Sequence, residues 1–522
     1  MATSDVHTAT TYANTLIKAL ARFPERIALA QDEDSVTYRE LAAHISKLIQ
    51  LLEKRGLRAG DGIAQLSKNS IAAATVQLAA FVMGLRYTPL HPLGSREDHA
   101  HILADSGSAV LIFDATAFQT HVKEMTAANG LGLPLLSHQK CELADDLFGL
   151  SDDFTASPLV TTSKATDIVA LLYTGGTTGK PKGVALTSAN MVMNALLTLS
   201  EWEWPNQIRF LCATPITHAT GCMLIPILLR GGTVFLQESF KAQAFVHGVK
   251  RHSITATFLV PTMIYVLLDE HSEARDELAS LEMIIYGGSP ISPKRLQQAI
   301  EVFGPKFMQV YSQSEAPNCA TILRRFEHQS NEADRLASCG RPLLGIDVAV
   351  LNEHDQPVAQ GSIGEVCFRG PSVMQGYWNR PQDTSETLRN GWLHTGDMAY
   401  QDAEGYLYIV DRKKEMIITG GFNVFPREIE DVLMEHPSVK GATVIGVPDG
   451  KWGEAIKALV VLHDGHAIDQ SELIAYVKAR KGAVAAPKSV DFVGSLPLTA
   501  VGKPDRKAVR ARFWSDQSRQ VG

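Results

Sequence analysis

Residues 173–183 of this chain concentrate groups that bind phosphate. The run reads Tyr-Thr-Gly-Gly-Thr-Thr-Gly-Lys-Pro-Lys-Gly and follows the apolar segment 168–172. Glycines let backbone N–H groups turn toward one point, and lysines add charge suited to an oligophosphate. The run is not a Walker A loop, because Pro181 stands where that pattern needs Ser or Thr. We therefore expect a nucleotide site rather than a plain surface loop, and not a P-loop.

Three further residues carry chemistry that a nucleotide enzyme needs. Glu315 follows a strand-like run and a polar turn, and its carboxylate suits a Mg²⁺ ion that bridges phosphates. Asp397 follows His-Thr-Gly, which reads as a tight turn, and suits a ribose diol. His218 lies among apolar residues. Taken singly, each has an ordinary alternative: a loop acid, a turn acid and a satisfied core histidine.

Taken together, the order and spacing of five segments resemble the adenylate-forming superfamily over essentially the whole chain. Residues 174–183 are similar to its [ST]-[SG]-G-[ST]-[ST]-G-x-P-K-G signature, and residues 311–315 resemble its Y-G-x-T-E element. Residues 395–397 match T-G-D, residues 411–415 match the hinge motif, and residues 497–503 match P-x-T-x-x-G-K. The branch most similar is that of the acyl- and aryl-CoA synthetases, the AMP-forming acid–CoA ligases.

The resemblance implies two half-reactions and three cofactors: ATP, Mg²⁺ and coenzyme A. A carboxylate would attack the α-phosphorus of Mg·ATP to give an acyl adenylate and pyrophosphate. A thiol would then attack the adenylate, and AMP would leave. A small C-terminal domain would rotate about Lys414 between the two steps.

The resemblance also implies roles for particular residues. ATP or AMP would be bound by Thr174, Gly175, Gly176, Thr177, Thr178, Gly179, Lys182, Gly288, Ser289, Pro290, Tyr311, Ser314, Asp397 and Arg412. Lys503 would bridge carboxylate and α-phosphate, with Glu315 as the Mg²⁺ ligand and His218 beside the carboxylate. Gly420, Gly421 and Phe422 would line the coenzyme A tunnel. The acid pocket would comprise His218, Met263, Tyr265, Gly287, Ser312, Asn318 and Cys319.

The segment 215–221 bears on the acid, because amino-acid-activating members generally carry an aspartate there. This chain has His218 and no acid in that segment, and a buried ammonium without a counter-charge is costly. An uncharged organic acid is therefore favoured. Ser312 replaces the usual glycine of the Y-G-x-T-E element, so we expect a narrowed pocket that takes a medium-chain or aromatic acid.

The acceptor thiol is expected to be coenzyme A, because about twenty residues follow Lys503 and leave no room for a fused carrier domain. Two alternatives stay open: a stand-alone enzyme that loads a separate acyl carrier protein, and an inactive nucleotide-binding scaffold. Intact Lys503, Glu315 and Asp397 speak against the scaffold. Luciferase-type oxidation shares the same motifs and is less favoured than thioester formation.

Composition narrows the class of protein. The chain has 522 residues and a formal net charge of −7, so no nucleic-acid footprint is evident. Its six cysteines form no C-x-x-C pair, which suits a reducing compartment rather than a disulfide framework. No signal peptide is recognisable, and the longest apolar run is too short to span a bilayer. We expect a cytoplasmic enzyme acting on small molecules, and a homodimer stays open.

Strand-like runs that alternate with helical patterns predict an α/β fold with parallel sheets. Strands are expected at residues 110–113, 168–172, 257–260, 283–286 and 308–311, a buried helix at 72–85, and an acidic loop at 142–153. The expected organisation is a large N-terminal domain (1–410) and a small mobile α+β domain (411–522). The former would hold two parallel-type α/β subdomains and a small β-rich subdomain that starts near residue 335. The latter would carry the hinge and the catalytic lysine.

Overall fold

The computed structural model describes residues 9–174, 180–329, 335–499 and 504–514. Six residues with predicted roles lie outside this part of the chain: Gly175, Gly176, Thr177, Thr178, Gly179 and Lys503.

The first sheet has eight strands in the order β19-β9-β8-β4-β3-β5-β6-β7. Its strands are β3 (Gly62–Leu66), β4 (Arg86–Leu90), β5 (Ser108–Phe113), β6 (Leu135–Ser137), β7 (Asp145–Asp146), β8 (Ile168–Thr174), β9 (Lys182–Thr187) and β19 (Gly376–Tyr377). The run from β8 to β7 is parallel, whereas β9 and β19 are antiparallel additions. The predicted phosphate loop therefore joins two neighbouring antiparallel strands, β8 and β9.

The second sheet has nine strands in the order β16-β15-β14-β13-β12-β10-β11-β1-β2. Its strands are β1 (Ile27–Gln31), β2 (Asp34–Thr37), β10 (Arg209–Cys212), β11 (Thr233–Leu236), β12 (Ala256–Leu259), β13 (Met283–Gly287), β14 (Phe307–Tyr311), β15 (Thr321–Leu323) and β16 (Arg341–Pro342). Strands β14 to β1 are parallel, and both edges are antiparallel.

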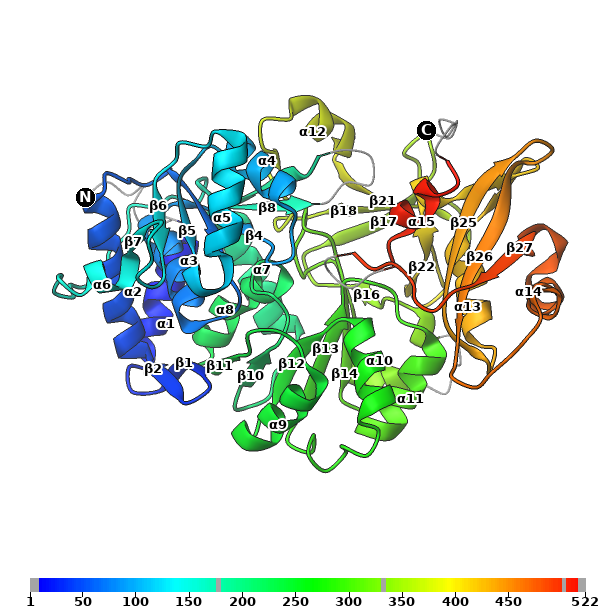
Figure 1. The fold of residues 1–522 in the computed structure, drawn as a ribbon, viewed down its shortest axis with the longest axis horizontal. Helices are drawn as coiled ribbons and strands as arrows, with labels where there is room; N and C mark the ends of the chain where they lie inside the picture. Colours follow the sequence, from blue (N-terminus) through cyan, green and yellow to red (C-terminus); the bar gives the residue numbers. More distant parts are fainter. Residues whose placement is uncertain (1–8, 175–179, 330–334, 500–503, 515–522) are drawn as a thin grey trace.

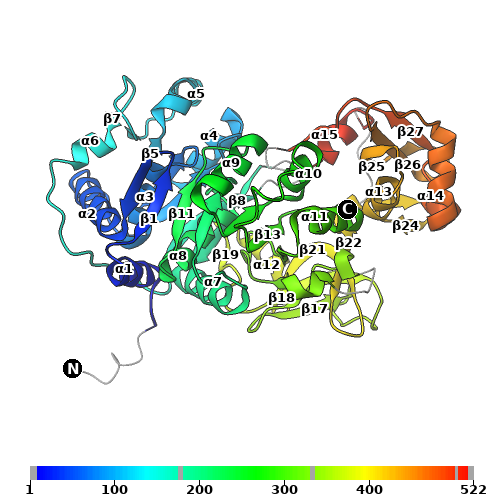
Figure 2. The same cartoon turned by 90° about the horizontal axis from the view of Figure 1, so that it is seen from below.

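Helices separate and cover the two sheets (Figures 1 and 2). One continuous core joins the facing sides of both sheets through α1 (Tyr12–Arg22), α2 (Tyr38–Lys54), α3 (Ile71–Met83), α7 (Ser188–Glu201) and α8 (Ala219–Leu229). The outer side of the first sheet packs on α4 (Arg96–Ser106) and α5 (Ala115–Asn129). The outer side of the second sheet packs on α9 (Ala242–His252), α10 (Pro261–Glu270) and α11 (Pro293–Phe303). The predicted helix at 72–85 is α3, buried on all sides because it lies between sheets.

The predicted β-rich subdomain is a five-stranded antiparallel sheet that lies between the large sheets and the C-terminal part in Figure 1. It contains β17 (Asp347–Leu351), β18 (Gly364–Arg369), β20 (Leu388–Arg389), β21 (Trp392–Gln401) and β22 (Leu407–Arg412). Helix α12 (Pro381–Thr387) packs beside β19 and β20, and short 3₁₀ turns occupy Arg325–Gln329, Arg335–Ala337 and Lys413–Glu415.

The C-terminal part forms its own α+β unit at one end of the molecule, drawn in orange and red in Figure 1. Strands β23 (Ile417–Thr419), β24 (Phe422–Val424), β25 (Val439–Asp449), β26 (Gly453–Leu462) and β27 (Ser489–Phe492) make one sheet. Helices α13 (Pro426–Met434), α14 (Gln470–Ala485) and α15 (Arg506–Ala511) accompany it. The α/β fold class with its small C-terminal α+β part is thus confirmed.

One expectation about local structure is wrong. The acidic segment 142–153 is not a plain loop, because it contains β7 and the short helix α6 (Leu147–Ser151). Asp146 explains the helix: its side chain caps the first turn by accepting the Gly149 N–H, which offsets an otherwise unpaired donor.

Candidate active site

Three residues predicted to hold the nucleoside meet at one carboxylate. The Tyr311 hydroxyl donates to Asp397 Oδ2 at 2.6 Å, and Arg412 Nε donates to Asp397 Oδ1 at 3.0 Å. Gln313, which the sequence interpretation missed, donates to the same Oδ2 at 2.7 Å. Its position inside the 311–315 motif could have marked Gln313 as a site residue. The Asp397 carboxylate raises the pKa of Arg412, so the guanidinium stays charged beside it.

Asp397 is presented by a strand and not by the predicted tight turn. The run from His394 to Asp397 lies within β21, where Gly396 has a φ of +70°. A left-handed residue inside a strand is a glycine position, and it breaks the regular course of the chain just before Asp397. The Thr395 hydroxyl accepts the Asp397 N–H at 3.0 Å. The local sequence therefore orients the carboxylate without a reverse turn.

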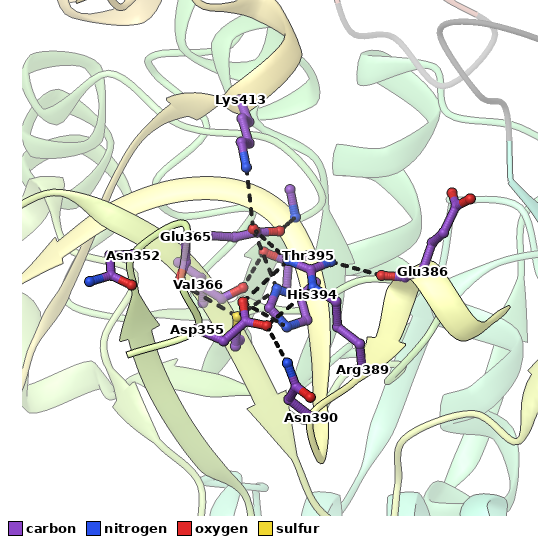
Figure 3. A network of polar contacts seen from close by, with 12 residues as sticks. Asn352, Asp355, Glu365, Val366, Glu386, Arg389, Asn390, His394, Thr395 and Lys413 are labelled. Carbon is purple, nitrogen blue, oxygen red and sulfur yellow. Dashed lines mark hydrogen bonds and ion pairs between the residues drawn. The ribbon is translucent and has the colours of Figure 1, made fainter. Parts of the chain in front are cut away.

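Glu365 contacts this strand and connects it to Lys413, the neighbour of the predicted hinge residue (Figure 3). Its Oε1 accepts the Gly396 N–H at 3.0 Å, and its Oε2 lies 3.8 Å from Lys413 Nζ. The same Oε2 lies 3.4 Å from His394 Nδ1. Lys414, the predicted hinge residue, directly follows Lys413, and partial burial and the nearby Arg412 charge lower its pKa. Glu365 was missed because nothing in the sequence near it marks a site.

The two ends of the predicted phosphate loop are paired across β8 and β9. Thr174 and Lys182 are register partners, so the loop leaves and re-enters the sheet at one place. The Lys182 ammonium group forms an ion pair with Asp383 and lies 5.3 Å from the centroid of the Tyr377 ring. Asp383 comes from α12, about two hundred residues further along the chain.

Helix α4 holds both flanks of the loop. The Tyr173 hydroxyl donates to Asp105 Oδ2 at 2.7 Å, and His101 Nε2 donates to the Pro181 carbonyl at 3.1 Å. His101 and Asp105 are four residues apart, so they share one face of α4. These two residues were not predicted, since an ordinary helical pattern surrounds them.

Glu315, the predicted Mg²⁺ ligand, is only 8% exposed and accepts a hydrogen bond from the Tyr377 hydroxyl at 2.7 Å on Oε1. Tyr377 therefore lies between Glu315 and Lys182. Among the residues that the structure describes, no three or more His, Cys, Asp or Glu side chains form a metal cluster. This arrangement suits Mg²⁺, which proteins bind through one or two carboxylates while substrate phosphates and water complete the octahedron.

The predicted adenine-side turn follows β13. Gly288 has a φ of +79°, and Ser289 and Pro290 continue the turn toward α11. Gly287, assigned to the acid pocket, has a packing reason to be glycine, because a Cβ there would collide with the Val310 carbonyl oxygen. Ser314 lies in the turn just before Glu315.

His218 stands at the start of α8 and lines a narrow cavity. The other walls are Gln77, Phe81, Tyr87, Pro89, Ala170, Leu172, Met191, Ile216, Thr217, Gly221 and Cys222. Most of these are apolar, and no carboxylate is among the described residues that line the cavity. His218 Nδ1 lies 2.9 Å from Thr217 Oγ1 in a hydrogen bond. Gln77 is 4% exposed and its Oε1 has no partner within the described chain.

The other residues predicted for the acid pocket do not line this cavity. The Tyr265 hydroxyl accepts the Ser292 N–H at 2.8 Å, and Met263, on the same helix, packs against the core of the second sheet. The Ser312 hydroxyl donates to the Ala316 carbonyl, and the Cys319 thiol is fully buried. Asn318 contacts the residue next to His218: its side-chain amide donates to the Ala219 carbonyl at 3.0 Å.

Gly420 and Gly421 form the two-residue turn of the β23–β24 hairpin. Thr419 and Phe422 are register partners, and both glycines have positive φ, +58° and +81°. Such turns need residues that tolerate φ > 0, so conformation as well as small size explains the two glycines. A Cβ on Gly420 would lie 2.7 Å from the Trp452 ring. Phe422 is 58% exposed.

Comparison with known proteins agrees with this geometry. The model of the AMP-binding enzyme family matches residues 16–378, and that of the AMP-binding enzyme C-terminal domain matches residues 428–503. The chain belongs to the AMP-binding enzyme family. The predicted adenylate-forming resemblance is thereby confirmed, and with it the enzyme class, an ATP-dependent ligase of the acyl-CoA synthetase branch. ATP, Mg²⁺ and coenzyme A are the cofactors of this family.

Individual relatives cover nearly the whole chain. The medium/long-chain-fatty-acid–CoA ligase FadD8 of Mycobacterium tuberculosis is 45% identical over 97% of this chain and 91% of its own. A feruloyl-CoA synthase of Amycolatopsis sp is 38% identical over 94% and 96%. The solved structure of the amide bond synthetase McbA from Marinactinospora thermotolerans is 32% identical, covers 96% of this chain and 99% of its own, and superposes with a TM-score of 0.88. In the described residues, no helix has the length and apolar character needed to cross a bilayer.

Proposed function

We propose that this enzyme activates a medium-chain or aromatic carboxylic acid with Mg·ATP and transfers the acyl group to coenzyme A. The observation that carries the proposal is the cavity beside His218, whose described lining is largely apolar and holds no carboxylate. An amino-acid substrate would leave its ammonium group buried without a counter-charge there, which is costly. The relatives named above act on a fatty acid and on an aromatic acid, which supports the same range.

The nucleoside is held, in this proposal, by the group around Asp397. The Asp397 carboxylate and the Arg412 guanidinium bind the ribose hydroxyls, and the Tyr311 ring stacks on adenine. Burial, followed by the Asp397 charge, raises the pKa of Tyr311, so its hydroxyl keeps its proton and remains a donor to Asp397. A fixed carboxylate of this kind orients the ribose without reorganisation during the reaction.

The phosphates lie toward residues 174–182, with Lys182 as the charged group. The ion pair with Asp383 on α12 holds the Lys182 ammonium group in place. When bound at Glu315, Mg²⁺ neutralises the charge of the pyrophosphate group. Tyr377 keeps the Glu315 side chain in place through the 2.7 Å hydrogen bond.

The chemistry then needs one cation at the reacting centre. A carboxylate oxygen of the acid attacks the α-phosphorus, the bond to the pyrophosphate oxygen breaks, and Lys503 stabilises the charge that passes between them. In the second step the coenzyme A sulfur attacks the acyl carbon and AMP leaves. Gly420, Gly421 and Phe422 line the path of the thiol, and Lys414 is the pivot between the two arrangements. A cytoplasmic location, where the six free thiols stay reduced, and a homodimer complete the hypothesis.

A substrate panel tests the proposal. Acid-dependent exchange of labelled pyrophosphate into ATP is measured with acids from acetate to palmitate and with benzoate- and cinnamate-type acids, followed by thioester formation with coenzyme A or a holo carrier protein. We expect the highest kcat/KM with medium-chain or aromatic acids, and coenzyme A as the acceptor. A maximum at palmitate, or transfer to the carrier alone, would contradict the proposal.

A further inference from the structure

His91 lies at the end of strand β4 in the first sheet, next to His218. It directly follows β4, whose Tyr87 and Pro89 line the cavity. Since side chains alternate along a strand, position 91 continues the side on which positions 87 and 89 lie. The ring centroids of His91 and His218 are 5.0 Å apart with an interplanar angle of 78°. This is the edge-to-face arrangement that aromatic rings prefer.

The His91 ring is itself held by its surroundings. Its Nδ1 accepts the Leu93 N–H at 3.1 Å, and its carbonyl accepts a hydrogen bond from His99 Nε2 at 2.9 Å. His99 Nδ1 in turn lies 3.0 Å from His121 Nε2. A Cβ on Gly94 would collide with the His99 ring, so the segment 91–95 packs tightly on α4. His91 is therefore a fixed element and not a mobile loop side chain.

Protonation agrees with a fixed, uncharged ring. Burial lowers the pKa of His91, and burial lowers the pKa of His99 to about 4. A neutral His91 that accepts at Nδ1 carries its proton on Nε2. A neutral His99 that donates from Nε2 accepts at Nδ1, which assigns the donor role to His121. His91, His99 and His121 can therefore all be neutral at pH 7 with one consistent set of tautomers.

The contact also joins two separate parts of the fold. His91 extends from the first sheet, whereas His218 comes between β10 of the second sheet and α8. The carboxyl ends of parallel strands are where ligands of such sheets bind. The His91–His218 ring pair is one of the contacts between the two sheets, and it lies beside the cavity.

We propose that His91 is a positioning residue that fixes the His218 ring at the mouth of the acid cavity. It thereby sets the orientation in which an acid enters. The proposal rests on the proposed role of His218 next to the carboxylate, and it adds a residue on a different strand, in a different sheet, that acts through His218.

A double-mutant cycle in the pyrophosphate exchange reaction tests this role. His91→Ala is expected to raise KM for the preferred acid by about threefold to tenfold, the effect of losing one aromatic contact, with KM for ATP unchanged. His91→Phe keeps the ring and is expected to restore the wild-type value, whereas His91→Asn is not. In a His218→Ala background, His91→Ala is expected to have no further effect. Leu93→Ala, an exposed change in the same segment, is the matched control.

Two kinetic results would overturn the proposal: additive effects of the two alanine substitutions, or rescue by asparagine and not by phenylalanine. Wild-type exchange and thioester formation report the proposed function separately, so an active wild type with an additive cycle rejects only the role of His91. A crystal structure of the His91→Ala enzyme gives a readout without turnover. The His218 ring is expected to change its orientation, and an unchanged ring would reject the role of His91.

Discussion

Arg506 donates a hydrogen bond from Nη1 to Oδ1 of Asp411 at 3.0 Å. Arg506 is three residues beyond Lys503, and Asp411 is three residues before Lys414, so this contact ties the segment after Lys503 to the near side of the proposed hinge. Arg506 also donates to both carboxylate oxygens of Glu430, at 3.1 and 2.5 Å. A rotation about Lys414 would carry Glu430 along with Arg506 but would leave Asp411 behind. In the proposed mechanism, with Lys414 as the pivot, the bond to Asp411 would break between the two half-reactions.

Asp411→Asn is therefore expected to change the balance between the half-reactions. The charge of the pair is lost while the shape of the side chain is kept, so the arrangement that needs the pair becomes less favoured. We expect the rates of adenylation and of thioester formation to move in opposite directions, each by roughly tenfold, as for a hydrogen bond to a charged group. Pyrophosphate exchange and transfer from a supplied acyl adenylate measure the two steps separately. Equal changes in both would show that the contact plays no part in the rotation.

Arg506→Met is expected to destabilise the C-terminal unit strongly. Burial raises the pKa of Glu430, and removing its partner leaves an unpaired carboxylate in that site. Breaking a buried pair on one side costs about 3–5 kcal/mol of the free energy of unfolding. Urea unfolding monitored by fluorescence gives the value. Arg480→Met is the control, because Arg480 and Glu435 form an exposed pair that is expected to contribute less than about 1 kcal/mol.

The nucleoside group predicts a ribose-specific defect. Asp397→Asn replaces the acceptor of Tyr311, Gln313 and Arg412, and we expect KM for ATP to rise by roughly tenfold. Discrimination between ATP and 2′- or 3′-deoxy-ATP should shrink in the variant, since the substitution would remove the proposed contact with a ribose hydroxyl. Asp347→Asn, at an exposed pair with Arg369 in the same antiparallel sheet, controls for general effects of removing a carboxylate. Undiminished discrimination in Asp397→Asn would place the ribose elsewhere.

Gln77 predicts a change in acid preference. Its buried amide oxygen lacks a partner among the described residues, and an unpaired buried acceptor favours a ligand that brings a donor. Gln77→Leu is expected to raise kcat/KM for wholly apolar acids and to lower it for hydroxylated acids of the same length, by roughly tenfold in the ratio. The ratio is read from paired acids in the exchange reaction. Met191→Leu changes another wall of the cavity without a polar group, and an equal shift there would remove the role of Gln77.

Much of the fold and part of the site could be predicted from the sequence, because those features are local. The strands ending near Tyr311 and the helix 72–85 follow from short-range apolar patterns, and Tyr311, Asp397 and Arg412 each stand inside a motif. Glu365, Asp383 and His91 have no such signal, since the partners on which their roles depend, Gly396, Lys182 and His218, are far from them in the chain. Their roles depend on which strands become neighbours, which periodicity does not encode.

The Gly396 position shows the same limit at short range. The run Thr-Gly-Asp suggests a turn from composition, but β21 continues through it: β18 pairs with His394 and Met398 on either side of a register shift, and β22 pairs with Asp397. The glycine then serves a left-handed distortion within a strand. Pairing between strands that are distant in sequence therefore determines whether this glycine forms a reverse turn or a distortion within a strand.

In the proposed mechanism, Lys503 promotes adenylate formation, which precedes transfer of the acyl group to coenzyme A. Measuring the two half-reactions separately in Lys503→Ala tests this role most directly. We expect acid-dependent pyrophosphate exchange to fall by about 10²–10³, while the variant still converts a supplied acyl adenylate and coenzyme A into thioester and AMP. Loss of both activities to the same extent would contradict the two-step assignment, as would release of ADP and orthophosphate by the wild-type enzyme.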